Sequence, residues 1–241
     1  MQFLTKLSPI FILKKQIKWK AKLYLSALSS LIILQAIFIV LSLNQGFASE
    51  GYGQADLDVQ FSIYSLDIYL LTAMLWAIIT GLLFSTKGYR QDDLAIISSR
   101  TSSAIANSFV MILYSIVAVL ILVSSYFIQI ICLFMLQKDA LIINQIIISP
   151  FILLVCFCSI SFSGSVGLLI GYCFQGPRIL KFAMTFLCIG FSVITIIYPN
   201  LINLQPFILL PNLVISAGLF LIAIICCSLT AWIARHSEVT S

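Results

Sequence analysis

The sequence predicts an all-α polytopic membrane protein, and three observations lead to this fold class. First, the 241 residues are 61% hydrophobic and only 9% charged, which is too little charge for the surface of a soluble domain. Second, long stretches contain no acidic or basic side chain, and each approaches or exceeds the about 20 residues that a helix needs to cross a bilayer. These stretches are residues 23–49, 68–86, 101–137, 140–177 and 182–234. Third, the basic residues gather on one side of the topology that the stretches imply.

We expect six spanning helices. They lie at about 23–43, 68–84, 104–127, within 142–174, at 182–198 and at 213–233, and the third can extend to Met135. The run after Asp139 is too long for one straight span and contains Pro150, so it tilts, kinks or begins with an interfacial piece. The last run holds two spans, because prolines and asparagines interrupt it over 199–212. That segment is itself apolar, and both a re-entrant or interfacial hairpin and an ordinary loop at the headgroups fit it.

The positions of lysine and arginine predict the orientation. In the six-span topology, all 13 of these residues except Lys138 lie on the side that holds both termini. The positive-inside rule places this side in the cytosol. We therefore expect a multi-pass protein of the cell (plasma) membrane with both termini cytosolic. The net charge of +5 is explained by contact with anionic membrane lipid and needs no nucleic acid.

The chain is expected to form a single transmembrane domain over residues 1–241. Within it, residues 1–22 form a cytosolic amphipathic helix, 23–234 the six-helix membrane part and 235–241 a cytosolic tail. The first segment mixes lysines with large apolar side chains such as Phe3, Phe11 and Trp19. This mixture is typical of a helix lying on a membrane surface. The alternative is a disordered tail, which has no use for so many large apolar groups.

The sequence predicts no catalytic residue and no metal or cofactor site. An intramembrane enzyme or proton-coupled carrier needs ionisable groups at depth, whereas the deep polar residues here are Gln35, Asn107, Gln129 and scattered serines and threonines. The only histidine, His236, follows the last span, and the 7 cysteines lie in or near spans, where we interpret them as small apolar packing residues. The chain has no G-x-x-x-x-G-K-[ST] loop, so it cannot bind ATP by that route.

Small residues in the fourth span predict close helix packing. Ser163 to Gly167 resembles a serine-nucleophile sequence, but the glycine two residues before the serine is missing and no span contains a histidine base. We interpret Gly164, Gly167 and Gly171 as a surface that lets another helix approach closely.

The connection between the second and third spans is the strongest local signal for a functional site. It combines charges with a segment that favours helix, and Asp92 or Asp93 can cap a short helix over Leu94–Ser98. A loop that only turns needs no such mixture. A helix seated on lipid is the alternative. The candidate site residues in this loop are Lys87, Arg90, Asp92, Asp93, Leu94, Ile97 and Arg100.

With this loop, the chain resembles the membrane subunits of ABC-2-type exporters. The resemblance covers essentially the whole chain, through its plan more than its motifs: a basic amphipathic helix, six spans, both ends cytosolic, a charged loop with glycine and a short helix, and an apolar segment at 199–212. It implies the type V exporter-like architecture. In that family the inner loop docks on a separate ATPase. This chain departs from the usual loop pattern, because Lys87 precedes the glycine and Arg100-Thr101 replaces a proline.

The resemblance implies a permease subunit that moves a peptide, an antibiotic or another amphiphile out of the cell. It also implies partners: a cytosolic ABC ATPase subunit that binds ATP and Mg²⁺, and a second permease subunit, identical or related. The protein itself would not be an enzyme. A non-transporting membrane scaffold, sensor or immunity protein is the alternative function. Neither the cargo nor the choice between homodimer and heterodimer follows from the residues.

Overall fold

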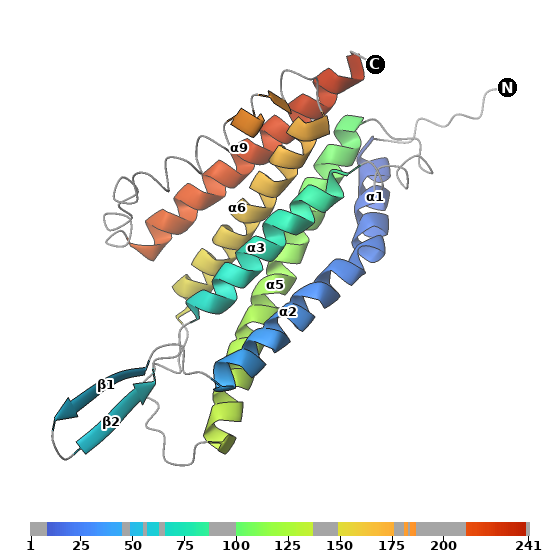
Figure 1. Cartoon of the computed structure of the whole chain (residues 1–241). Coiled ribbons are helices and arrows are strands. Elements are labelled where there is room, and N and C mark those ends of the chain that lie inside the picture. The colour runs from blue at the N-terminus through green and yellow to red at the C-terminus, as the bar shows by residue number, and fades with distance from the viewer. Residues whose placement is uncertain are drawn as a thin grey trace.

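The structure is a computed structural model, and it describes residues 9–44, 49–54, 57–62, 66–86, 100–136, 149–175, 181–182, 184–186 and 211–239. The described part is a bundle of long helices with a β-hairpin at one end (Figure 1). The elements in chain order are α1 (Pro9–Leu23), α2 (Leu25–Asn44), β1 (Ser49–Gln54), β2 (Leu57–Ser62), α3 (Asp67–Phe84), α5 (Arg100–Leu136), α6 (Pro150–Gln175) and α9 (Asn212–Val239).

Within the described residues, four helices are long and apolar enough to cross a membrane. They cover Asp67–Phe84, Arg100–Cys132, Pro150–Gln175 and Asn212–His236. Helices α1 and α2 add a fifth if the bent pair is one span, with a bend of 41° between Leu13–Leu23 and Leu25–Leu41. The helical, membrane-spanning fold class is confirmed at this level. The predicted fifth span (182–198) and the apolar segment at 199–212 lie almost entirely outside the described residues.

Pro150 begins a helix and does not kink one. It is the first residue of α6, and the carbonyl of Ser149 accepts hydrogen bonds from the amides of Ile152 and Leu153 at 2.9 and 3.4 Å. At the first helical position the missing N–H of proline removes a donor that has no partner within the helix. The structure thus places the start of this span at the proline.

A β-hairpin joins α2 to α3 and was not part of the all-α prediction. Strands β1 and β2 pair antiparallel, with a register that runs from Ser49↔Ser62 to Gln54↔Leu57. The sequence of β2, LDVQFS, alternates apolar and polar residues with the period of a strand. The hairpin projects from the end of the bundle opposite α1 (Figure 1).

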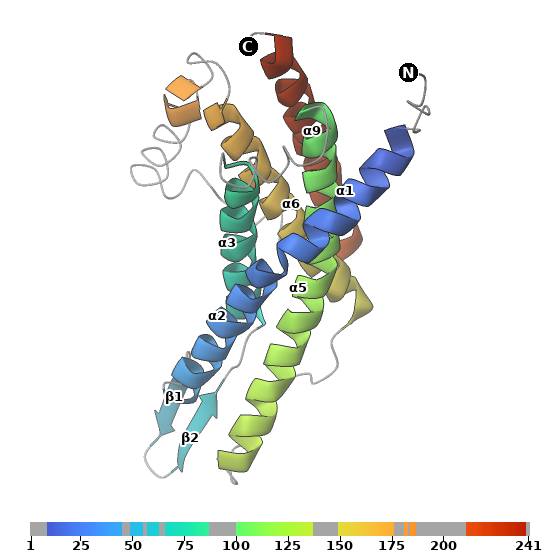
Figure 2. The ribbon, with the colours of Figure 1, turned by 90° about the vertical axis from the view of Figure 1, so that its right-hand side faces the viewer.

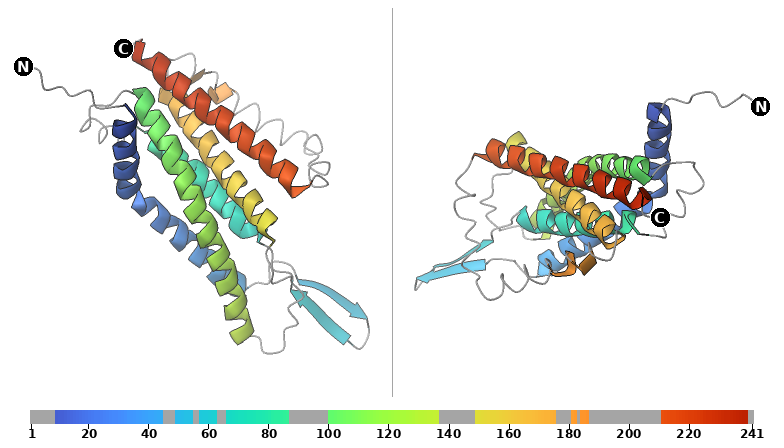
Figure 3. Two further views of the ribbon diagram at one scale, coloured as in Figure 1. Left: turned by 180° about the vertical axis from the view of Figure 1, so that it is seen from behind. Right: turned by 90° about the horizontal axis from the view of Figure 1, so that it is seen from above.

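Helix α5 is the centre of the described bundle, because it contacts α1, α2, α3, α6 and α9. Helices α3, α6 and α9 run in the same direction, whereas α5 runs in the opposite one (Figures 1 and 2). The C-terminal end of α9 lies at the same end of the bundle as α1. Seen along the bundle, α1 leaves it sideways (Figure 3, right). We call the end that holds α1 the α1 end.

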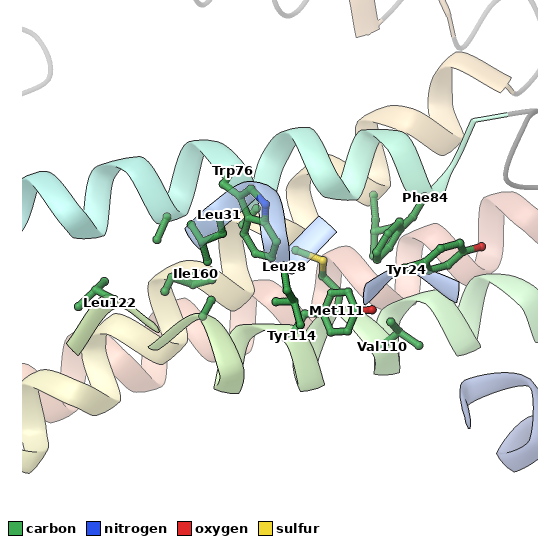
Figure 4. Packing of buried hydrophobic residues seen from close by; sticks show 14 of the residues in the cluster. Tyr24, Leu28, Leu31, Trp76, Phe84, Val110, Met111, Tyr114, Leu122 and Ile160 are labelled. Carbon is green, nitrogen blue, oxygen red and sulfur yellow. The ribbon is translucent and has the colours of Figure 1, made fainter. Parts of the chain in front are cut away.

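One buried face continues from α1 into α2 across the break at Tyr24. The amide of Tyr24 still donates to the Lys20 carbonyl at 3.0 Å, so the helical path bends without losing its face. The buried side chains recur at intervals of three or four residues: Gln16, Lys20, Tyr24, Leu28, Leu31 and Gln35. This spacing is that of one helix face. Tyr24, Leu28 and Leu31 enter the apolar core together with Trp76, Phe84, Met111 and Tyr114 (Figure 4).

Candidate functional site

A buried lysine joins α1 to the first turns of α5. The side chain of Lys20 is 0% exposed, while the other lysines of α1 are exposed. Its Nζ atom donates to Asn107 Oδ1 at 2.7 Å, to Ser103 Oγ at 2.8 Å and to the Ser103 carbonyl at 3.3 Å. An ammonium group carries three N–H donors, and these oxygens offer each of them an acceptor.

Asn107 extends this contact to two more helices. While its Oδ1 accepts from Lys20, its Nδ2 donates to the Phe84 carbonyl and to the Tyr172 hydroxyl, both at 3.2 Å. Phe84 is the last residue of α3, where carbonyl groups have no partner within the helix. One amide side chain therefore links α1, α3, α5 and α6. We call Lys20, Phe84, Ser103, Asn107 and Tyr172 the Lys20 cluster.

Two further hydrogen bonds hold α1 against α5. The Ser102 hydroxyl donates to Gln16 Oε1 at 2.7 Å, and the Tyr114 hydroxyl donates to the Ala21 carbonyl at 2.9 Å. Below them, Tyr24 stacks on Phe84 with ring centroids 4.5 Å apart, and Phe84 meets Tyr114 edge-on at 6.0 Å (Figure 4). The bend between α1 and α2 is thus packed against the C-terminal end of α3.

The electrostatics make Lys20 an unusual core residue. Moving an ammonium group out of water is costly unless oxygens surround it. The first turn of α5, which begins at Arg100, also carries partial positive charge from the helix dipole. The side-chain oxygens of Ser103 and Asn107 must offset both effects. Ionisable groups buried in membrane proteins are rare and often functional, so the cluster is the strongest candidate site among the described residues.

In the sequence, the loop with the predicted site residues lies between two members of this cluster, Phe84 and Ser103. Lys87, Arg90, Asp92, Asp93, Leu94 and Ile97 fall outside the described residues, and Arg100 is the first residue of α5. The described ends of the loop are Thr86 and Arg100. Phe84 lies just before one end and Ser103 just after the other. The Lys20 cluster therefore ties the two ends of this loop to α1.

The predicted glycines lie where α6 meets its neighbours. A Cβ atom built on Gly167 would collide with the Ile78 backbone of α3, and one on Gly171 with the Ser85 side chain at the end of α3. Gly164 instead faces the side chain of Met111 on α5. Gly81 of α3 takes part from the other side, since its Cβ would lie 2.5 Å from the Gly164 carbonyl oxygen.

Asn107 is buried, in agreement with its prediction as a deep polar residue, whereas Lys20 was expected among the surface lysines of an interfacial helix and is buried instead. A signal for Lys20 exists in the spacing. Gln16, Lys20 and Tyr24 follow one another at four-residue intervals and continue the face of Leu28. Tyr172 carries no such signal, because its role depends on the approach of α6 to α5. Within the described residues, no group of three or more His, Cys, Asp or Glu side chains is arranged to hold a metal ion.

Comparison of the chain with protein-family models, with curated proteins and with solved structures found no match.

Proposed function

We propose that the chain is the membrane-spanning permease subunit of an ATP-binding cassette exporter. In this proposal, it moves a peptide, an antibiotic or another amphiphile out of the cell with ATP hydrolysed by a separate cytosolic subunit. Two permease subunits form the pathway, and both termini face the cytosol.

The observation that carries the proposal is the link between α1 and the helix ends that flank the charged loop. Asn107 contacts the α3 residue just before the loop, the α1 lysine and the α6 tyrosine. A docked ATPase that displaces the loop would therefore also displace α1, α3, α5 and α6, because the Asn107 contacts join these helices. Transitions of this kind move packed helices as whole units relative to one another, and the side-chain contacts at their interfaces repack.

The helix directions support the six-span part of the proposal. Helices α6 and α9 run in the same direction (Figure 1). Two spans that run the same way need an odd number of crossings between them, and the predicted span at 182–198 supplies one. The α1 end, with Lys14, Lys15, Lys18 and Lys22 exposed on α1, is then the cytosolic end by the positive-inside rule.

Accessibility of single cysteines tests this topology. In a background without native cysteines, cysteines at Asp58, Lys138 and Asn203 should react with an impermeant thiol reagent in intact cells. Cysteines at Lys15, Asp92 and Arg178 should react only after the cells are opened. Labelling at Asp92 from outside would exclude the proposed orientation.

Partner dependence tests the function. The chain purified alone should hydrolyse no ATP above background, because it lacks a phosphate-binding loop. Purified in mild detergent with its partners, it should carry vanadate-sensitive ATPase activity. Replacing both Asp92 and Asp93 with Lys should weaken this association by about 2–5 kcal/mol if the charges are paired at the interface, which is at least roughly thirtyfold in affinity.

The matched control is the double replacement of Asp56 and Asp58 with Lys on the predicted outer side, which should leave the ATPase bound. ATPase activity of the isolated chain would refute the permease assignment. Two results together would favour the alternative, a scaffold, sensor or immunity protein. The wild-type chain would retain no ATPase on purification, and its deletion would leave export unchanged.

A further inference from the structure

A groove lies between α5, α6 and α9 on a different side of α5 from the Lys20 cluster. Its volume is about 270 Å³. The side chains at its rim are exposed and those at its floor are buried, so it opens toward the surroundings of the bundle. The lining residues contributed by α5 are Ile105, Ser108, Phe109, Met111 and Ile112. They belong to the N-terminal part of α5, so the groove lies in the half of the bundle nearest α1.

The lining has no charged side chain, and it is apolar apart from hydroxyl and thiol groups. Its four serines are Ser108, Ser161, Ser165 and Ser228. Three of them donate to a carbonyl of their own helix: Ser108 to Ala104 at 3.1 Å, Ser165 to Phe162 at 2.7 Å and Ser228 to Ile224 at 2.8 Å. Such bonds satisfy a hydroxyl within a helix.

Ser161 is different from the other three. It is 4% exposed, and its Oγ atom has no hydrogen-bond partner among the described residues. A buried hydroxyl without a partner is unfavourable, particularly where no bulk water can reach it. The groove lining therefore combines an apolar surface with one serine whose hydroxyl has no partner among the described residues.

We propose that this groove binds an uncharged amphiphile, with its alkyl or aryl part on the apolar lining and a hydroxyl or carbonyl oxygen hydrogen-bonded to Ser161. The absence of charged residues from the lining selects against ionic head groups, because an unpaired charge there would lose its hydration. The inference concerns binding alone and does not rest on the proposed exporter function.

The size of the groove limits what it can hold. At roughly 30 Å³ for a water-sized group, 270 Å³ accommodates about nine such groups. That is a short chain segment with its polar atom, or one ring, and not a whole diacyl lipid. The rest of a longer molecule would extend past the exposed rim residues Phe109, Phe220 and Ile224.

Photolabelling of the purified full chain in lipid nanodiscs tests the proposal. The probe is hexadecanol with a diazirine in its chain, and the comparison probes are hexadecane and hexadecyltrimethylammonium with the same diazirine. Labelled residues are identified by mass spectrometry, and the half-saturating probe concentration is measured. The alcohol should label the groove segments of α5, α6 and α9 saturably. The ammonium probe should not.

Variants separate the hydrogen bond from the apolar contact. Ser161→Ala should raise the half-saturating concentration of the alcohol about threefold to tenfold, the usual effect of one net hydrogen bond, and leave that of the alkane unchanged. Ser159→Ala, which removes another buried serine of α6 outside the lining, should change neither. Ala223→Phe fills the groove and should abolish saturable labelling by both probes, and Ala231→Phe does so from a second position if the first variant fails to fold.

The proposal is overturned if Ser161→Ala leaves alcohol binding at the wild-type value, or weakens the alcohol and the alkane equally. Labelling that never saturates and spreads over all lipid-facing residues would also overturn it. Binding of the ammonium probe as tightly as the alcohol would contradict the uncharged ligand.

Discussion

Two interfaces of the bundle are built in opposite ways. Helix α1 meets α5 through side-chain hydrogen bonds, with Lys20, Gln16 and the Ala21 carbonyl as contacts. Helix α3 meets α6 through glycines, with Gly81 and Gly167 facing backbone atoms of the other helix. The first interface depends on polar groups that can exchange partners. The second depends on close backbone approach, which tolerates almost no displacement.

The difference indicates where this molecule can move. A glycine contact between backbones is lost entirely when the helices separate by the width of a methyl group, so α3 and α6 should move as one unit. The hydrogen bonds of Lys20 can lengthen, exchange partners or take up a water molecule. We therefore expect relative motion at the interface of α1 with α5, beside the charged loop.

The largest expected effect comes from removing the amide at the centre of the Lys20 cluster. Asn107→Leu takes away one acceptor of the buried ammonium group and the donor to the Phe84 carbonyl. Breaking a buried charged contact from one side typically costs about 3–5 kcal/mol. The free energy of unfolding in mild detergent, from a denaturant titration, should fall by this amount.

A double variant sharpens the result. Lys20→Met together with Asn107→Leu removes both partners, so most of the loss should be recovered. Lys22→Met on the exposed side of α1 is the control and should stay within about 0.5 kcal/mol of wild type. Equal losses in the single and double variants would show that the ammonium group is not stabilised by Asn107.

The next effect concerns the glycine interface. Gly167→Ala places a methyl group against the Ile78 backbone, and overpacking of this kind costs about 1–3 kcal/mol. Gly218→Ala in α9 is the matched control, because nothing lies within 4 Å of its added Cβ. That control should be neutral or slightly stabilising, since alanine favours helix. Thermal unfolding midpoints in detergent compare the pair, and equal midpoints would contradict the close packing of α3 on α6.

The smallest effect tests the hydrogen bond that joins α2 to α5 farther from the bend. The hydroxyl of Ser125 donates to Gln35 Oε1 at 2.6 Å. Ser125→Ala removes the donor to the buried Gln35 Oε1 and should lower the free energy of unfolding by about 1–2 kcal/mol. Ser124→Ala next to it removes an exposed hydroxyl that donates to the Leu120 carbonyl of its own helix, and it should change stability by less than about 0.5 kcal/mol. A difference below the error of the unfolding titration would assign Gln35 no role in holding α2.

The long apolar helices were predictable because they are local properties of the sequence. A charge-free run of sufficient length indicates a membrane helix whatever its neighbours are, and α2, α3, α5 and α9 agree with the predicted ranges. The period-two pattern of β2 was present but short. Burial of Lys20 was not predictable from composition, because its acceptors follow 83 and 87 residues later. The groove with Ser161 likewise exists only where α5, α6 and α9 come together.

The separation between Lys20 and its acceptors also has a consequence for how the protein is made. At roughly 5–20 residues per second, the ribosome adds Ser103 several seconds after Lys20. During this interval α1 and α2 can already reach the membrane, while the ammonium group has to remain among water and phosphate groups. We expect a chain truncated before Arg100 to leave Lys20 open to amine-reactive reagents and the complete chain to protect it. The first helices would thus insert before their final packing is formed, and α5 would fix their position when Ser103 and Asn107 bind Lys20.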